Sequence, residues 1–433
     1  MRSTRETFHN RVLGTLVGVL LLMAGPILPA AGQVRLSWWD RTHPQQVGHY
    51  WIKSDLPADY AGALARHLNT MYAEYDRRLA SLPPRAPESL NVLIFQRRRD
   101  YLQTLQRRYG VDGTATGGLF FVTPSSGHAL ALWTEGLARR RILSVLQHEG
   151  FHQFAYSRFG GDLPVWVNEG LAEFFGEAIP VGRTLMAGGN NPRVIEAVKD
   201  SIELGTSIPF EKMLAMSSRR WAQGLSEGTA MGQYQQAWSM VQFLIAGDNG
   251  RYVDRFETYL RLLHAGFPSQ HSFIKAFQTS DIEAFERRWQ RHALAARPSG
   301  FLAALQRIEF LAEGALELSR RGVSPESLVE LRDALVAAGF SLVLHRHAQE
   351  IELPAQDEAM YRIPGGRPGE QPPVFVVRKA ALSSLTEPRR RPEDDVQPTP
   401  PSIHTEYLRP FNASIRWRRD PDTNELSYEI IVR

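Results

Sequence analysis

The segment His148-Glu149-Gly150-Phe151-His152 carries the residue types and spacing best suited to chemistry. Residues four apart lie on one face of an α-helix, so a helical segment would place the two imidazoles side by side. Two imidazole nitrogens can then bind one metal ion at about 2.0–2.1 Å. Glu149 would lie beside them, where its carboxylate can accept a proton from a water molecule activated by the metal. The pattern therefore predicts a hydrolytic metal site.

A third ligand is available in the nearby segment Asn168-Glu169-Gly170-Leu171-Ala172-Glu173. Glu169 and Glu173 are four apart, so on a helix both carboxylates would face the same way. A catalytic zinc ion needs three protein ligands and an open position, whereas a structural zinc site usually has four protein ligands. The spacing alone allows either glutamate to complete the set with His148 and His152. The chain has 13 histidines, so the five-residue pattern can arise by chance, and this second segment is what favours a metal site.

The first residues have the composition of an export signal. Three arginines within the first eleven residues precede a largely apolar stretch over residues 12–28, and the small residues Pro29-Ala30-Ala31-Gly32 follow. We expect a signal peptide over residues 1–32, cleaved after Gly32 or, as second choice, after Ala30. An uncleaved membrane anchor is the alternative, although the apolar run is short for a membrane-spanning helix and contains glycine and proline.

The overall composition excludes several classes of site. The 433 residues include no cysteine, which removes disulfides, thiolate metal ligands and cysteine nucleophiles. The net charge of +4 is small, and no basic stripe with interleaved aromatic residues is present, so we do not expect nucleic acid binding. No later stretch is apolar enough to predict an integral membrane domain after signal cleavage. An exported chain without cysteine suits a bacterial envelope, and we expect a periplasmic or secreted protein.

The pattern of apolar residues divides the mature chain into three parts. Residues 33–134 are predicted to mix strands and helices, whereas residues 135–297 are predicted to be mainly helical. Residues 298–433 follow a change of character at Ala296-Arg297-Pro298-Ser299-Gly300. The strands and helices expected in the first part are a strand at 49–53, a helix at 60–82, a strand at 90–95, a helix at 100–109 and a hairpin of 117–122 with 128–133.

The segment with the two histidines is predicted to be a helix from about residue 135 to residue 159. Gly160-Gly161 would end it, as glycine commonly does just beyond the last turn. A second helix would begin near Pro164 or Val165, since proline is favoured in a first turn, and end before Pro180. Further helices are expected at 233–245, 252–263 and 281–294.

The last part is predicted to be a smaller α/β region. Helices are expected at 301–321 and 325–338, followed by strands. Residues 386–401 hold five prolines and mixed charges, which is typical of a linker or an exposed loop. Alternating apolar residues on either side of an Asp-Pro-Asp-Thr-Asn turn predict a final hairpin. An additional binding role is the favoured interpretation of this region.

Together with the preceding Trp166-Val167, the two histidines and Asn168-Glu169 resemble the gluzincin class of zinc peptidases, which includes thermolysin and the aminopeptidase N family. More narrowly, they resemble the peptidase MA-like group of bacterial proteins. The resemblance covers roughly residues 140–250 and is specific for the two-helix site. It implies a zincin-like α+β fold with a mixed sheet, an active-site helix and a helical subdomain.

The resemblance also implies the ligand set. One Zn²⁺ per chain would be held by His148, His152 and Glu169, and Glu173 would be the outer acid that orients the first histidine. The sequence departs from the pattern in one respect, because 16 residues separate His152 from Glu169, slightly fewer than in the best-known gluzincins. This departure keeps Glu173 as the alternative ligand.

The implied reaction is peptide-bond hydrolysis, in which Glu149 acts as the general base and later passes its proton to the leaving amine. In the aminopeptidase branch a tyrosine downstream stabilises the oxyanion, and Tyr234 lies at a similar distance after Glu169. The alternative for Tyr234 is a buried aromatic residue on an amphipathic helix.

The substrate is expected to be a peptide or protein. In zincins an edge strand pairs with the extended substrate, and either 117–122 or 128–133 is a candidate for that strand. The glycine-rich, glutamate-containing motif of the aminopeptidase branch has no counterpart between residues 85 and 140. The sequence therefore favours an exported zinc-dependent endopeptidase. The alternative function is a non-catalytic envelope binding or assembly protein that retains the fold.

Overall fold

The computed structural model describes Trp39 and residues 42–85, 89–114, 116–124, 127–181, 184–189, 191–346, 349–365, 369–379, 398–419 and 426–433. Three expectations concern segments beyond this set: the signal peptide, residues 386–397 of the linker and the turn at residues 420–424. The described chain is an α+β structure built on a mixed sheet, as the sequence predicts.

The mixed sheet has five strands in the order β1-β2-β3-β5-β4. The three inner strands β2 (Tyr50–Ser54), β3 (Leu90–Phe95) and β5 (Gly127–Trp133) run parallel, and the edge strands β1 (Gln45–Val47) and β4 (Gly118–Thr123) run antiparallel to their neighbours. The sequence of β3 is almost continuously apolar, as expected for a strand covered on both faces. The predicted strands and the predicted hairpin of this part are confirmed.

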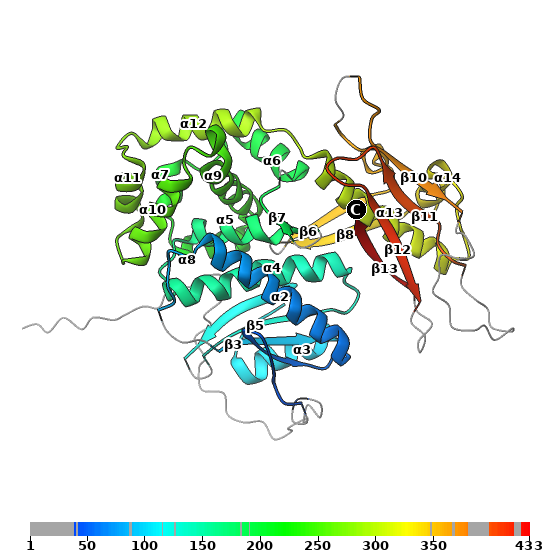
Figure 1. Cartoon of the computed structure of the whole chain (residues 1–433), viewed down its shortest axis with the longest axis horizontal. Helices are drawn as coiled ribbons and strands as arrows, with labels where there is room; N and C mark the ends of the chain where they lie inside the picture. Colours follow the sequence, from blue (N-terminus) through cyan, green and yellow to red (C-terminus); the bar gives the residue numbers. More distant parts are fainter. Residues whose placement is uncertain are drawn as a thin grey trace, which may run out of the picture.

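Helices cover both faces of this sheet (Figure 1). One face packs against α2 (Ala58–Arg78) and α4 (Arg139–Phe159), and Val92 and Ile94 point into this layer. The other face packs against α3 (Arg98–Thr104) and the π-helical turn Leu105–Tyr109 that continues it. Because side chains alternate along a strand, the neighbouring β3 residues Leu93 and Phe95 belong to this second layer.

The middle of the chain forms a helical layer beside α4. Its central helix, α5 (Val165–Gly176), is buried along its whole length. The short hairpin β6 (Ile179–Val181) and β7 (Thr184–Met186) follows α5. The remaining helices are α6 (Pro192–Glu203), α7 (Phe210–Leu214), α8 (Ser218–Glu227), α9 (Ala230–Gly250), α10 (Val253–His264), α11 (Ser269–Phe277) and α12 (Ile282–Ala295). The helices expected at 233–245, 252–263 and 281–294 are confirmed as parts of α9, α10 and α12.

The C-terminal part has its own hydrophobic core, formed where α13 (Gly300–Arg320) packs on an antiparallel sheet. The strand order of that sheet is β10 (Val374–Arg378), β11 (Ser402–Glu406), β12 (Ala413–Arg419) and β13 (Leu426–Val432). The predicted final hairpin is confirmed, with Trp417 opposite Tyr428. A helix, a two-stranded hairpin and a 3₁₀ turn complete this part: α14 (Leu328–Ala337), β8 (Ser341–Arg346) with β9 (Gln349–Pro354), and Glu358–Tyr361.

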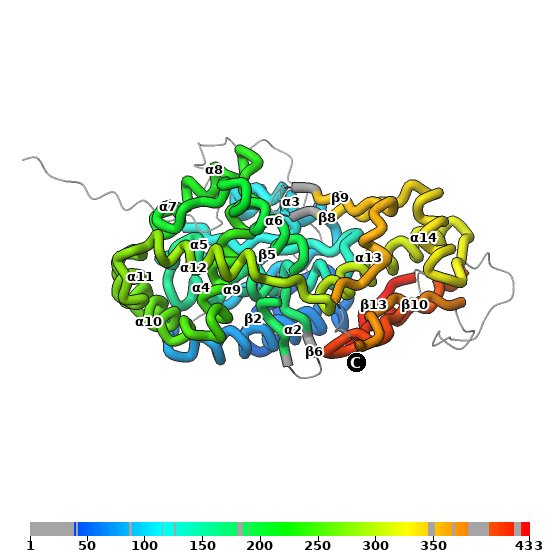
Figure 2. Tube along the Cα trace, turned by 90° about the horizontal axis from the view of Figure 1, so that it is seen from above, coloured from blue at the N-terminus to red at the C-terminus, as the bar shows by residue number. Residues whose placement is uncertain are grey.

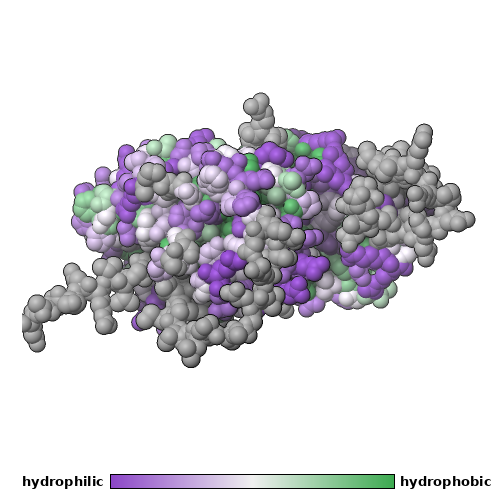
Figure 3. Space-filling model, turned by 90° about the horizontal axis from the view of Figure 1, so that it is seen from below, coloured by the Kyte–Doolittle hydropathy of each residue, from purple (hydrophilic) through white to green (hydrophobic). Residues whose placement is uncertain are grey.

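The C-terminal elements lie at one end of the molecule, and the helices α7, α10, α11 and α12 lie at the other (Figures 1 and 2). Within the described ranges, each helix is too short or too polar to cross a membrane. On the face seen in Figure 3, hydrophilic residues dominate the coloured surface, and apolar residues are scattered among them.

Candidate metal centre

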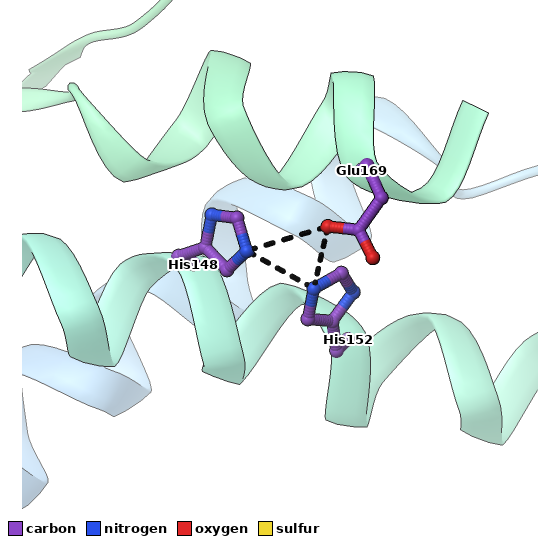
Figure 4. A group of neighbouring side chains, drawn as sticks. All are labelled: His148, His152 and Glu169. Carbon is purple, nitrogen blue, oxygen red and sulfur yellow. Dashed lines mark hydrogen bonds and ion pairs between the residues drawn. The ribbon is translucent and has the colours of Figure 1, made fainter. Parts of the chain in front are cut away.

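Helices α4 and α5 carry the residues that the sequence singles out. Helix α4 begins at Arg139 rather than near residue 135, because the preceding turn places Gly136 at a φ of 68° and Ala138 in an extended conformation. It ends where Gly160 adopts a left-handed conformation with φ 61°, as the sequence predicts. Figure 4 shows the two histidines on one face of α4, pointing toward Glu169 on α5.

The three side chains converge on one point. The Nε2 atoms of His148 and His152 are 3.1 Å apart, and Glu169 Oε2 lies 3.5 Å from the first and 3.3 Å from the second (Figure 4). Ligands bound tetrahedrally to zinc at about 2.0–2.2 Å lie roughly 3.3–3.6 Å apart. The two separations to Glu169 fall in this range and the 3.1 Å separation is slightly shorter, so the three atoms suit a single ion of that size. Among the described residues no further His, Asp or Glu belongs to the group.

The surroundings of Glu169 also favour the binding of a cation. Its side chain is 1% exposed, and in the described part of the chain neither carboxylate oxygen accepts a hydrogen bond from a group other than the two imidazoles. Burial would raise the pKa of Glu169, but His152 and His148 lower it to about 2, so the group is ionised. A buried carboxylate needs a compensating charge, and a metal ion between the three ligand atoms would supply it.

Glu173 contacts the opposite side of His148. Its Oε1 atom lies 3.1 Å from His148 Nδ1, which leaves Nε2 to face Glu169. Burial would lower the pKa of His148, but Glu169 and Glu173 raise it to about 10. A metal ion requires neutral imidazole, so its binding would displace protons here. The structure thus brings Glu169 to the two Nε2 atoms and places Glu173 against the opposite nitrogen of His148.

The side chain of Glu149 extends from α4 to the edge strand β4. Its Oε2 atom accepts a hydrogen bond of 2.8 Å from the backbone N–H of Phe120. Burial raises the pKa of Glu149, and the charges of His148 and His152 oppose that effect. The close approach of α4 to β4 depends on Gly118, because a Cβ there would lie 2.4 Å from Val145 Cγ1. Glu149 and His148 are partly exposed, so the site is accessible from their side.

Tyr234 lies on α9, which crosses α5 closely. A Cβ at Gly170 would lie 2.6 Å from the Ala237 carbonyl oxygen, so glycine is what allows this crossing. Tyr234 is 7% exposed, and its ring meets that of Trp221 edge-on at 5.1 Å. Burial raises its pKa well above the usual value, and the negative charge of Glu169 raises it further. The residue is thus a buried aromatic, as one interpretation expects, and it also lies within electrostatic reach of the centre.

Sequence reasoning missed a cavity of about 150 Å³ beside this centre. Ser144, Glu173 and Glu177 line it, and Arg193 and Arg307 also belong to its wall. The cavity reaches Glu173 and Ser144 rather than the ligand atoms themselves. Its walls come from α4, α5, α6, α9, α13 and the β8–β9 hairpin, and no spacing within one segment signals such a combination.

The comparisons with known proteins concern this same region. A protein-family model described as a protein of unknown function (DUF1570) matches residues 142–261. The matched segment contains most of α4, all of α5 and α9, and therefore the two histidines, Glu149, Glu169, Glu173 and Tyr234. No curated protein matches the chain. The similarity thus coincides with the candidate metal centre and leaves its chemistry to be argued from the residues.

Proposed function

We propose that the protein is an exported zinc metallopeptidase of the gluzincin type with a zincin-like fold. The observation that carries this proposal is the convergence of His148 Nε2, His152 Nε2 and Glu169 Oε2 at separations of 3.1–3.5 Å. Two imidazoles and one carboxylate suit zinc better than magnesium or calcium, which prefer oxygen ligands. Three protein ligands also leave a position for water or substrate, as a catalytic zinc site requires.

Glu149 supplies the base that a hydrolytic site needs. When bound, zinc would supply Lewis-acid chemistry that activates water for attack on a carbonyl carbon. The Phe120 N–H holds the Glu149 carboxylate on the accessible side of the centre. From there the carboxylate accepts the proton of the attacking water and passes it to the leaving amine. Tyr234, whose raised pKa keeps its hydroxyl protonated, would donate to the developing oxyanion.

The edge strand β4 favours an extended peptide as substrate. Strand β5 lies between β3 and β4, so of the two candidate strands only β4 is at an edge of the sheet. The Phe120 N–H points away from β5, and by alternation the backbone groups of Gly118 and Val122 share that open edge. A substrate segment paired along β4 would pass Glu149. Such pairing can bind the middle of a chain, which supports an endopeptidase.

The proposal is tested by a mixed-peptide digest with zinc-loaded protein beside its Glu149→Gln variant. We expect cleavage by the parent protein, and unchanged zinc content without cleavage in the variant, because Gln keeps the shape of Glu149 but cannot accept the proton. Mass spectrometry of the digest identifies the cleaved bonds, and elemental analysis gives the zinc content. Equal cleavage by both proteins would show that Glu149 is not the base, and no cleavage by the parent across diverse peptides would argue against a peptidase.

A further inference from the structure

The cavity beside the metal centre joins two distant parts of the chain. Ser144 and Glu173 line it next to His148, and Arg193 of α6 lines it as well. The C-terminal part contributes Arg307 of α13 and the β8–β9 hairpin. A peptide bound at the metal centre could therefore extend into this cavity. The C-terminal part completes the walls of the cavity.

The arginines of this wall differ in their partners. Arg140 forms ion pairs with two carboxylates, because its guanidinium lies 3.7 Å from Glu177 and 3.5 Å from Glu309. Arg307 donates a hydrogen bond of 2.6 Å to a backbone carbonyl, that of Arg362. Within the part of the chain that the structure describes, neither Arg193 nor Arg307 forms an ion pair with a carboxylate.

The two arginines without a carboxylate partner are also close enough to affect each other. Burial lowers the pKa of both guanidinium groups, and Asp357 partly opposes this effect. The charge of Arg307 lowers the pKa of Arg193 further. Both side chains are half-buried, so the wall presents two partly desolvated positive charges, and Asp357 is the acid whose charge acts on both. An anion between them would relieve that repulsion.

The β8–β9 hairpin adds an apolar surface to the same cavity. Leu342 pairs with Leu353, and Leu344 pairs with Ile351, and all four residues line the cavity. Val343, which lies between two of them and points to the other face, is 43% exposed. The cavity thus combines Arg193 and Arg307 with two apolar cross-strand pairs.

We propose that Arg193 and Arg307 bind a carboxylate of the substrate peptide while a neighbouring apolar side chain packs on the β8–β9 hairpin. The role of this site in catalysis depends on the proposed peptidase function, whereas the binding itself does not. Guanidinium groups match carboxylates in charge and geometry, and a partly desolvated site strengthens the pairing. The carboxylate can be the free C-terminus of a peptide or an acidic side chain.

Binding rather than turnover tests this inference. The Glu149→Gln protein, with and without zinc, is titrated with three labelled peptides of one apolar sequence. The first has a free C-terminal carboxylate, the second is amidated, and the third is amidated with one internal Glu. We expect a carboxylate to strengthen binding about tenfold or more over the plain amide. Arg193→Gln and Arg307→Gln should each remove most of that preference, and Arg193→Lys should retain part of it.

The control is Arg320→Gln, because Arg320 lies on the same helix as Arg307 but is exposed and paired with Glu317. It should leave the preference unchanged. Tight binding of the first peptide alone assigns the site to a C-terminus, and equal binding of the third extends it to acidic side chains. The inference is overturned if carboxylate peptides bind no better than the amide, or if both arginine variants keep the full preference. A carboxylate preference without digestion by the parent would retain this site and reject only the peptidase.

Discussion

The candidate metal centre and the Arg193–Arg307 pair lie beside one cavity, but the two groups differ in the contacts that their side chains make. In the centre, three ligand atoms lie within 3.5 Å of one another, and Glu169 is 1% exposed. The arginines come from α6 and α13, are half-buried and have no carboxylate partner in the described structure. The side chains of the centre contact one another, whereas the guanidinium groups of the two arginines are available to bind an anionic group of a ligand.

From this difference we infer separate tasks for the two regions. Catalytic groups work best when packing and hydrogen bonds fix them before the reaction begins. Charges that recognise a substrate need to be accessible and not already neutralised. Changes in the centre should therefore abolish metal binding or turnover, whereas changes in the arginine pair should alter recognition and leave the metal in place.

Removal of a ligand should have the largest effect. His148→Ala, His152→Ala and Glu169→Ala each leave two of the three converging donors, so we expect each variant to lose the one zinc per chain that we propose for the parent. Elemental analysis after dialysis against zinc-free buffer measures this loss. Arg307→Gln is the control from the other region and should retain zinc. Full occupancy in all three ligand variants would refute the assignment of the centre.

Tyr234→Phe removes one buried hydroxyl within electrostatic reach of the centre. If that hydroxyl stabilises the oxyanion, turnover should fall on the order of a hundredfold while zinc content stays the same. Tyr259→Phe is a matched control, because Tyr259 is also buried among these helices and its hydroxyl lies 2.9 Å from Ser269 Oγ. Initial rates of peptide cleavage compare the two variants. An unchanged rate in Tyr234→Phe would leave Tyr234 with a packing role alone.

Glu173→Gln tests the group that contacts the far nitrogen of His148. Gln keeps the shape but loses the negative charge 3.1 Å from Nδ1, so we expect zinc affinity to fall by about 10–100-fold. Competition with a chelator of known affinity measures the change. The roles of the two glutamates would be exchanged if this variant lost zinc completely while Glu169→Ala kept it.

Gly170→Ala probes the packing that holds the centre. The new Cβ would lie 2.6 Å from the Ala237 carbonyl oxygen and 2.7 Å from Val241 Cγ2, so α5 and α9 must separate, at a cost of roughly 1–3 kcal/mol. Gly232→Ala on the exposed side of α9 is the opposite case, since nothing lies within 4 Å of the added atom. It should stabilise the helix by roughly 0.5–1 kcal/mol. Urea unfolding measures both, and equal stabilities would contradict the close crossing.

Sequence reasoning reached the centre because its signals are local. His148 and His152 belong to one helix, so helical periodicity places their side chains on one face. Glu169 lies on the next helix, which follows after a short connection. The stop at Gly160 and the start after Pro164 are equally local. The sequence alone did not decide between Glu169 and Glu173, because that choice depends on how α5 is rotated against α4.

The cavity wall with Arg193 and Arg307 was not predicted, because its residues come from distant parts of the sequence. Arg193 and Arg307 are 114 positions apart, and the hairpin that completes the cavity lies farther along the chain. Only the docking of the C-terminal core beside α4, through contacts such as Arg140 with Glu309, brings them together. The same holds for β4, whose position at the sheet edge follows from strand order rather than from its own residues.

The last effect concerns the stability of the fold and not the protonation of the metal centre. His67 lies on α2, and burial, together with the charge of Arg139, lowers its pKa from 6.5 to about 4. Between these values the unfolded chain binds a proton at His67 and the folded chain does not, so acidification favours unfolding. The contribution is complete above pH 6.5 and is lost toward pH 4, by at most about 1.4 kcal/mol per pH unit. Urea unfolding of zinc-free protein at pH 7 and pH 5 should show a smaller loss of stability in His67→Gln than in the parent. Identical losses would mean that His67 is protonated equally in both states, and that the acid sensitivity of the fold arises elsewhere.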